Sequence, residues 1–254
     1  MRNQDIEEFV ALTKTSRSTA KKYLSNNNWA LEYALNDFYD TEQDGFISKP
    51  HPPELLALFN EYNKGDEDAI STDGLIKFMG DLDLDLEDPV TLCVADAMHC
   101  ASLSQSVSKE MFIQGWHENL CGNLLQIKEK VSELSEKLRS DAAYFEHIYS
   151  YTYALVLEPN EKQLDLETAI AYWQLLFPED SVYAIKVPQE RLQSWAAFLT
   201  GNVTRIHYDV WNMFLKFARM FPDDKVLKQG YNENDAWPVL IDEYYEYLEE
   251  EGQL

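Results

Sequence analysis

Cysteine and histidine are the side chains of this chain that could act as nucleophiles or metal ligands. Cys93, His99 and Cys100 lie close together in the sequence, and Cys121 follows. A thiolate beside an imidazole could bind zinc or transfer an acyl group. However, no Cys-x-x-Cys or His-x-x-x-His pair supplies further ligands, and a helix would place Cys93 and Cys100 two turns apart on one apolar face. Free cysteine is among the most buried residue types, so we interpret all three thiols as core residues, with a thioester-forming ligase as the alternative.

Acidic loops raise the possibility of calcium, which takes roughly six to eight oxygen ligands, including a bidentate Glu that closes an EF-hand loop. In three candidate loops the closing position is occupied by Gly74, Thr168 or Val210. None of these residues can supply a bidentate carboxylate to calcium. A fourth, which starts at Asp40, closes at His51, and the prolines around it prevent an exit helix. We therefore expect no bound metal, and a calcium-responsive adaptor is the alternative.

The charge of the chain indicates which kind of partner it can bind. It contains 45 Asp and Glu against 21 Lys and Arg, a formal net charge of -24. This field repels phosphate and attracts basic surfaces, so we expect a basic protein as partner, and neither nucleic acid nor a membrane. No segment approaches the roughly 20 apolar residues that span a bilayer, and the first residues look like neither a signal peptide nor a transit sequence. We expect a soluble protein of the cytoplasm and nucleus.

The predicted secondary structure begins with a small helical module in residues 1–40. Apolar residues at i, i+3 and i+4 predict three short helices, and Ser18 or Thr19 can cap the second. A polar stretch with several prolines follows and predicts a linker over residues 41–53. The predicted core of the module is Ile6, Phe9, Val10, Ala20, Tyr23, Leu24, Leu31, Ala34, Leu35 and Phe38.

Residues 54–254 carry the apolar period of a larger all-α domain. Long helical runs are expected at residues 54–62, 90–101, 123–138, 144–157 and 190–199. Four short β-like triplets interrupt the helices, each after a polar loop and before a new helix, and they begin at Ile70, Val107, Leu164 and Ile206. Because helix, loop, short strand contact and helix is the layout of an EF-hand, we predict EF-hand-like helix-loop-helix units without metal.

The C-terminal helix is expected to carry two different stripes. Its apolar stripe consists of Trp237, Ile241, Tyr244 and Leu248. Asp242, Glu246 and Glu249 form an acidic stripe on another face, although like charges four residues apart cost a helix about 0.2 to 0.5 kcal/mol. One interpretation is a solvated face, and the other is attraction to a basic partner.

Three runs of sequence are distinctive enough to carry a resemblance. They are Leu-Glu-Thr-Ala-Ile-Ala-Tyr-Trp at residues 166–173, Asp-Val-Trp-Asn at residues 209–212 and Ala-Trp-Pro-Val-Leu-Ile-Asp-Glu at residues 236–243. They resemble motifs of the defective-in-cullin-neddylation family. Trp29, followed by the apolar residues of the third helix, resembles a ubiquitin-associated (UBA) domain, so nearly the whole chain is covered. The resemblance implies an all-α potentiating-neddylation domain of EF-hand-like units without metal, with two binding surfaces.

The first implied surface is an acidic patch for the C-terminal winged-helix region of a cullin. By position it falls on Asp209, Ala236 and Asp242. Glu243 and Glu246 are its expected neighbours.

The second implied surface is a hydrophobic pocket for the acetylated N-terminal Met of the neddylation conjugating enzyme. By position this pocket draws on Leu75, Val90, Leu92, Ala95 and Val107. Ordinary core packing is the alternative for all five residues, and spacing alone does not separate the two interpretations.

The function expected from this resemblance is a scaffold that promotes transfer of the modifier to a cullin and so activates cullin-RING ubiquitin ligases. Holding two reactants together raises their effective concentration without a catalytic residue or cofactor from the scaffold. In agreement, no Gly-rich phosphate loop and no Gly-x-Ser-x-Gly elbow occurs in the sequence. The sequence leaves open whether the UBA-like module binds ubiquitin or the neddylation modifier.

Overall fold

The computed structural model describes residues 2–13, 15–27, 29–43, 52–63 and 68–254. In these residues the secondary structure is fourteen helices and four two-residue strands, so the predicted all-α class is confirmed. The chain divides into two compact units, Met1–His51 and Pro52–Leu254. No helix within the described ranges is long and apolar enough to cross a lipid bilayer.

The first unit is a three-helix bundle around a small aromatic core. Its helices are α1 (Arg2–Thr13), α2 (Arg17–Asn26) and α3 (Leu31–Gln43). All ten apolar residues predicted from the helical spacing belong to this core, together with Trp29. The rings of Phe9 and Tyr23 meet the ring of Phe38 edge-on, at centroid distances of 5.4 and 5.2 Å. The module therefore buries its own apolar face.

Two details of the first unit differ from expectation. The cap of α2 is Ser16, whose hydroxyl accepts a hydrogen bond from the N–H of Thr19 at 3.1 Å, so the prediction of Ser18 or Thr19 was wrong. The helix starts at Arg17, which leaves Ser16 as the last extended residue before it. Helix α3 also continues through Gln43, past the expected start of the linker. Residues 44–51, with most of the acidic loop that closes at His51, lie outside the described residues.

The described residues of the second unit form eleven helices and two pairs of very short strands. Its first half comprises α4 (Pro53–Tyr62), β1 (Ala69–Ile70), α5 (Thr72–Asp81), α6 (Val90–Ala97), β2 (Val107–Ser108) and α7 (Lys109–Glu118). Its second half comprises α8 (Leu124–Ser140), α9 (Ala142–Val156), β3 (Leu164–Asp165), α10 (Leu166–Leu176), α11 (Gln189–Asn202), β4 (Arg205–Ile206), α12 (Tyr208–Met220), α13 (Asp224–Gly230) and α14 (Val239–Glu250). Both strand pairs are antiparallel, with Ile70 opposite Val107 and Leu164 opposite Ile206. The four predicted strand positions are thus occupied by strands.

Polar side chains at the ends of three strands start the helices that follow. The hydroxyl of Ser71 accepts a hydrogen bond from the N–H of Gly74 at 3.4 Å, and that of Ser108 accepts one from Met111 at 3.2 Å. Asp165 caps α10 through the N–H of Thr168, and its bonds to this threonine lower the pKa of the carboxyl. These side chains satisfy helix N-termini, which otherwise leave backbone donors unpaired.

Helix α6 is shorter than the run predicted for residues 90–101, and this corrects the expected place of one cysteine. The helix ends at Ala97, and His99 adopts a left-handed conformation with φ of 56°. The N–H of Cys100 then bonds to the carbonyl of Ala95 at 2.9 Å, which closes a Schellman turn. Cys100 therefore lies in the loop after α6 and does not share a helix face with Cys93.

The second half of the second unit packs around a stack of aromatic side chains. The indole of Trp211 stacks on the rings of Trp173 and Tyr149, at centroid distances of 5.0 and 4.7 Å. The indole N–H of Trp173 donates to the hydroxyl of Tyr149 at 2.8 Å, and this hydroxyl donates to the carbonyl of Trp211 at 2.6 Å. All three side chains are buried. The tryptophans of two distinctive sequence runs therefore stabilise the fold.

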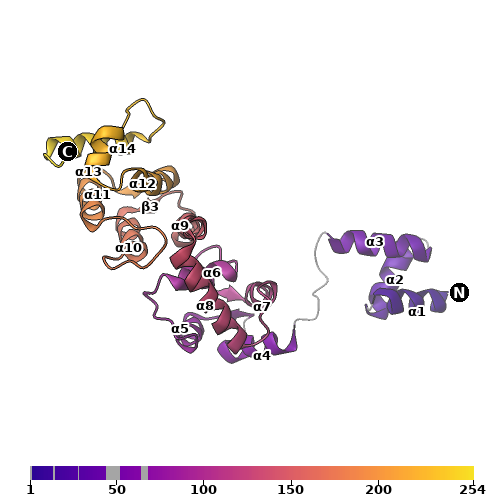
Figure 1. Ribbon diagram of the computed structural model, residues 1–254. Helices are drawn as coiled ribbons and strands as arrows, with labels where there is room; N and C mark the ends of the chain where they lie inside the picture. Colours follow the sequence, from indigo (N-terminus) through magenta and orange to yellow (C-terminus); the bar gives the residue numbers. More distant parts are fainter. Residues whose placement is uncertain (1, 14, 28, 44–51, 64–67) are drawn as a thin grey trace. The chain divides into compact units, whose positions relative to one another are not determined.

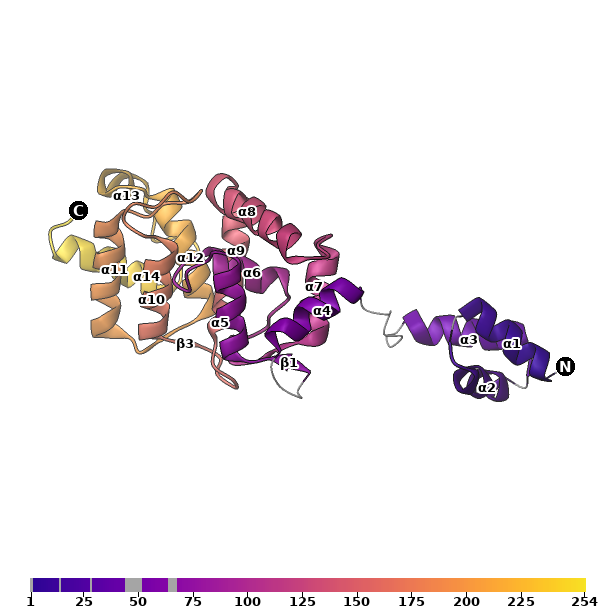
Figure 2. The same cartoon turned by 90° about the horizontal axis from the view of Figure 1, so that it is seen from below.

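Helix α9 lies in the middle of the second unit. Helices α4 to α8 gather at one end of this unit and α10 to α14 at the other, with α9 between them (Figures 1 and 2). The apolar stripe of α8, Ile127, Val131, Leu134 and Leu138, is buried at helical spacing. A single hydrophobic core runs through both halves, so the unit can hold two separate surfaces in a defined relation.

Candidate protein-binding surfaces

An apolar groove opens between the two halves of the second unit and has a volume of about 300 Å³. Four predicted pocket residues line it: Leu75 from α5, Leu92 and Ala95 from α6, and Val107 from β2. These residues come from three elements and meet because β2 pairs with β1 beside α5. The structure therefore brings most of the predicted pocket together.

Val90, the fifth predicted pocket residue, does not line this groove. Its side chain is buried and borders a different hollow, between the start of α6 and helix α8, together with Lys128 and Val131. The reason is helical geometry, because Val90 precedes Leu92 by two residues and so points to the opposite side of α6. The prediction of Val90 as a groove residue was wrong.

Three groove residues from the second half of the unit were not predicted. Leu155 from α9 and Tyr172 and Leu175 from α10 close one side of the groove. The hydroxyl of Tyr151 also donates to the carbonyl of Cys100 at 2.6 Å and holds the loop after α6 against α9. In the sequence these residues look like ordinary apolar positions of amphipathic helices. Only the packing of the two halves against each other identifies them as groove residues.

The groove is lined without any charged side chain. Its polar members are hydroxyls, an amide and the Cys100 thiol, and no Asp, Glu, Lys, Arg or His belongs to the lining that the described residues form. Burial raises the pKa of Cys100 to about 11 and raises that of Tyr172, so both stay neutral near pH 7. An occupant with a free charge would lose hydration there and find no counter-ion. The groove suits an apolar, uncharged chain end.

The candidate nucleophiles are buried thiols and a paired imidazole. Cys93 and Cys121 are buried, and burial raises the pKa of both thiols, that of Cys93 to about 12. The ring of His99 pairs with Glu118 at 2.8 Å. In the parts of the chain that the structure describes, no three His, Cys, Asp or Glu side chains are grouped as a metal site. The thiols thus have the properties expected of core residues.

A second candidate surface lies along α12 and the start of α14. Asp209 is exposed in the first turn of α12, on the same helix face as Lys216, about 10 Å further along the axis. The ammonium group of Lys216 lies 5.3 Å from the ring centre of Trp237. Ala236 directly precedes this ring and is exposed. Lys216 thus connects the helix that carries Asp209 with the segment that carries Ala236.

Asp242 lies in the first turn of α14, beside the exposed Glu243 and one helical turn before Glu246. Its Oδ1 atom accepts a hydrogen bond from the hydroxyl of Tyr231. The predicted apolar stripe of this helix is buried at Ile241, Tyr244 and Leu248, while Trp237 is half-buried just before the helix. The acidic side chains therefore project away from the core side of α14.

Four carboxylates belong to this acidic surface, namely Asp209, Asp242, Glu243 and Glu246. Among the described residues, no Lys, Arg or His nitrogen lies within 4.0 Å of any of them. Elsewhere in the unit carboxylates do pair, for example Asp81 with Lys77 at 2.8 Å. Negative charge is thus left available here for a cation from outside the chain.

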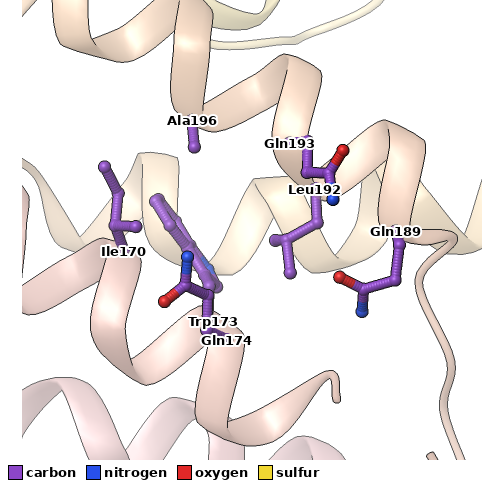
Figure 3. Close-up of a pocket in the computed structure, with 7 residues that line it drawn as sticks. All are labelled: Ile170, Trp173, Gln174, Gln189, Leu192, Gln193 and Ala196. Atoms are coloured by element: carbon purple, nitrogen blue, oxygen red, sulfur yellow. The ribbon is translucent and has the colours of Figure 1, made fainter. Parts of the chain in front are cut away.

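A third hollow, between α10 and α11, contains none of the predicted site residues. It has a volume of about 300 Å³. Figure 3 shows the side chains of Ile170, Trp173 and Leu192 directed into the space between the two helices. Gln174, Gln189 and Gln193 also line the hollow, so its lining is mixed rather than charged.

Comparison with known proteins decides the family. A model described as "Cullin binding" matches residues 126–247, and one described as "UBA-like domain" matches residues 3–45. "Defective in cullin neddylation protein 1" of Eremothecium gossypii is 41% identical over 98% of this chain and 96% of that protein. The chain belongs to the defective-in-cullin-neddylation family.

Other family members agree with this assignment over different lengths. The protein of the same name from Saccharomyces cerevisiae is 35% identical over 97% of this chain and 93% of its own length. "DCN1-like protein 3" of Drosophila melanogaster is 30% identical over 76% of this chain and 55% of its own length. The cullin-binding match includes all five residues of the predicted acidic surface and none of the predicted groove residues.

Proposed function

We propose that this family member acts in cullin neddylation as a scaffold, binding a cullin at the acidic surface and the conjugating enzyme in the groove. The observation that carries the proposal is the presence in one compact unit of an uncharged apolar groove and of exposed carboxylates that have no ion-pair partner among the described residues. The names of the relatives and the cullin-binding match support cullin neddylation as the reaction.

The acidic surface is proposed to bind the C-terminal winged-helix region of the cullin. Asp209 and Asp242 each lie in the first turn of a helix, where the backbone N–H groups stabilise their charge in the free protein. Lysine or arginine side chains of the partner are proposed to pair with both carboxylates. Close charge pairs across an interface can couple by roughly 1.5 to 7 kcal/mol.

The groove is proposed to take the N-terminally acetylated Met of the conjugating enzyme. Its volume of about 300 Å³ is at the lower end for a ligand pocket, which fits one side chain with its flanking amides. Met79 and Met98 line it together with aliphatic groups and can adapt to a flexible apolar chain. An acetyl cap removes the ammonium charge for which the groove offers no partner.

The scaffold is proposed to act without a catalytic residue of its own. Its buried thiols with raised pKa values are poor nucleophiles near pH 7, which argues against a thioester intermediate on Cys93 or Cys100. Positioning alone is sufficient, because holding the loaded enzyme near the acceptor lysine replaces a bimolecular encounter. The UBA-like unit is proposed to bind ubiquitin or the neddylation modifier separately.

The test is reconstituted, single-turnover transfer of the modifier from the loaded conjugating enzyme to a cullin, at increasing concentrations of this protein. A scaffold should accelerate transfer, and at high concentration the rate should fall again, because cullin and enzyme then occupy different scaffold molecules. A rate that rises to a plateau would contradict a purely bridging role. A thiol-sensitive adduct of the modifier with this protein would favour the thioester mechanism instead, and a calcium requirement would favour the adaptor.

A further inference from the structure

One hydrogen bond connects a tyrosine to the proposed cullin surface. Tyr231 follows the last residue of α13 and is half-buried. Its hydroxyl donates to Oδ1 of Asp242, in the first turn of α14. Helices α13 and α14 both belong to the C-terminal end of the second unit (Figure 1). The bond therefore joins the loop between these helices to the acidic surface.

The ring of Tyr231 is held on several sides by other aromatic rings. It stacks on Tyr245 at a centroid distance of 4.2 Å with an interplanar angle of 9°. It also lies 6.3 Å from Trp237, nearly parallel, and meets Phe221 edge-on at 5.9 Å. Such packing leaves few alternative rotamers, so the hydroxyl stays directed at the carboxylate of Asp242.

The hydroxyl of Tyr231 is also a permanent donor. Burial, followed by the contact with Asp242, raises the pKa of Tyr231 well above its ordinary value. It therefore keeps its proton throughout the physiological range. The carboxylate uses only Oδ1 for this bond, and within the described residues Oδ2 has no hydrogen-bond or ion-pair partner.

We infer that Tyr231 is a positioning residue, which holds one oxygen of Asp242 so that the other faces a lysine or arginine of the cullin. This inference rests on the proposed function of the acidic surface. A charged acceptor forms a stronger hydrogen bond than a neutral one, and a side chain fixed before binding loses less entropy when its partner arrives. Tyr231 thus contributes to cullin affinity without touching the cullin.

The test is the Tyr231→Phe variant, which removes the hydroxyl and keeps the ring in the stack. We expect its affinity for the cullin C-terminal region to fall about threefold to tenfold, a fraction of what a full charge pair contributes. Affinity for the acetylated N-terminal peptide of the conjugating enzyme should not change. Tyr245→Phe is the matched control, because it removes a hydroxyl from the stacked ring that interacts with Glu249 and not with Asp242.

A double-mutant cycle with Asp242→Asn separates positioning from packing. In the Asp242→Asn background the Tyr231→Phe change should have no further effect on cullin affinity. If Tyr231→Phe lowers cullin affinity equally in both backgrounds, its effect comes from packing and the inference is overturned. The same holds if peptide affinity and melting temperature fall in parallel with cullin affinity. If Asp242→Asn weakens binding but Tyr231→Phe does not, the inference fails and the acidic surface stands. If Asp242→Asn itself leaves cullin affinity unchanged, the proposed surface fails and the inference with it.

Discussion

The backbone N–H of Leu103 donates a hydrogen bond to the carbonyl oxygen of Leu155 at 2.8 Å, and this bond holds the loop after α6 against the end of α9. Both residues line the groove, Leu103 at its exposed rim and Leu155 on its buried side. The groove wall is thus built across the two halves of the second unit. Its shape depends on how those halves pack.

The absence of charge in the groove predicts a strong preference for an acetylated chain end. A peptide with the acetylated N-terminal Met of the conjugating enzyme should bind about tenfold or more tightly than the same peptide with a free ammonium group, which would be desolvated without a partner. Calorimetric titration of both peptides measures the difference. Equal affinities would remove the groove from the proposed mechanism.

Leu103→Arg provides the corresponding change in the protein. Leu103 is 57% exposed, so the substitution should leave stability within about 0.5 kcal/mol while placing a charge at the groove rim. We expect binding of the acetylated peptide to weaken about tenfold, since burying one apolar side chain contributes roughly 1.5 to 3 kcal/mol. Leu125→Arg is the control, because Leu125 is 67% exposed and does not line the groove.

The frame of the groove could be predicted from the sequence, whereas its lining residues came from the family resemblance. The strand contacts at Ile70 and Val107 follow a local pattern of polar loop, short apolar triplet and helix, and their pairing brings α5 and α6 together. The family resemblance named Leu92 and Ala95, and both line the groove because they share one helix face. Tyr172 and Leu175 could not be identified in this way, because no local pattern specifies how α10 packs on the first half.

Helix ends were the other source of error. Helix α6 ends where His99 adopts a left-handed conformation. Glycine is the residue type that usually takes this conformation after a helix, so histidine gave no signal of the helix end in the sequence. The helical spacing of the apolar residues therefore suggested a helix through Cys100 when the chain in fact turns. For the acidic surface the family resemblance gave the residues, and the structure added their surroundings, namely Lys216 over Trp237 and Tyr231 on Asp242.

The first unit should be dispensable for transfer. Deletion of residues 1–50 removes a bundle with its own core and leaves α4, which begins at Pro53, with the complete second core. We expect the truncated protein to retain its melting transition and to promote cullin neddylation in the reconstituted reaction. A folded truncation that has lost all activity would contradict the proposed division of labour.

Burial of the thiols predicts that stability falls at alkaline pH. A free thiol ionises near pH 9.0, whereas burial raises the pKa of Cys93 to about 12. Between these values the unfolded chain has released the proton and the folded chain retains it, so raising the pH favours unfolding. The contribution is fully present below pH 9.0 and is lost toward about pH 12.

Urea unfolding across this range measures the effect of Cys93 on the free energy of unfolding. Each group whose pKa is raised by folding lowers the free energy of unfolding by up to about 1.4 kcal/mol per pH unit in this range. Cys93→Ala should reduce this slope, although the variant is less stable at neutral pH because it loses a buried sulfur. An unchanged slope would show that the thiol is already ionisable in the folded protein, which would also revive it as a nucleophile.

The acidic surface is tested most directly by reversing two of its charges, Asp209→Lys together with Asp242→Lys. Both residues lie in first turns of helices without an internal cation nearby among the described residues, so we expect the helical circular dichroism signal to persist. Cullin binding should respond much more, because the change removes attraction and adds repulsion toward a basic partner. Even 2 kcal/mol, a value of about the expected size, would weaken the complex about thirtyfold.

The control for this variant must reproduce its effect on helices and on net charge. Glu110→Lys with Glu167→Lys does so, because these exposed residues lie in the first turns of α7 and α10 and the change in charge is the same. If long-range attraction by the net charge of -24 held the cullin, both double variants would weaken binding alike. A specific surface predicts instead that only Asp209→Lys with Asp242→Lys loses cullin affinity and neddylation, while both variants keep normal affinity for the acetylated peptide. Unchanged cullin affinity in that folded variant would exclude the acidic surface from the mechanism.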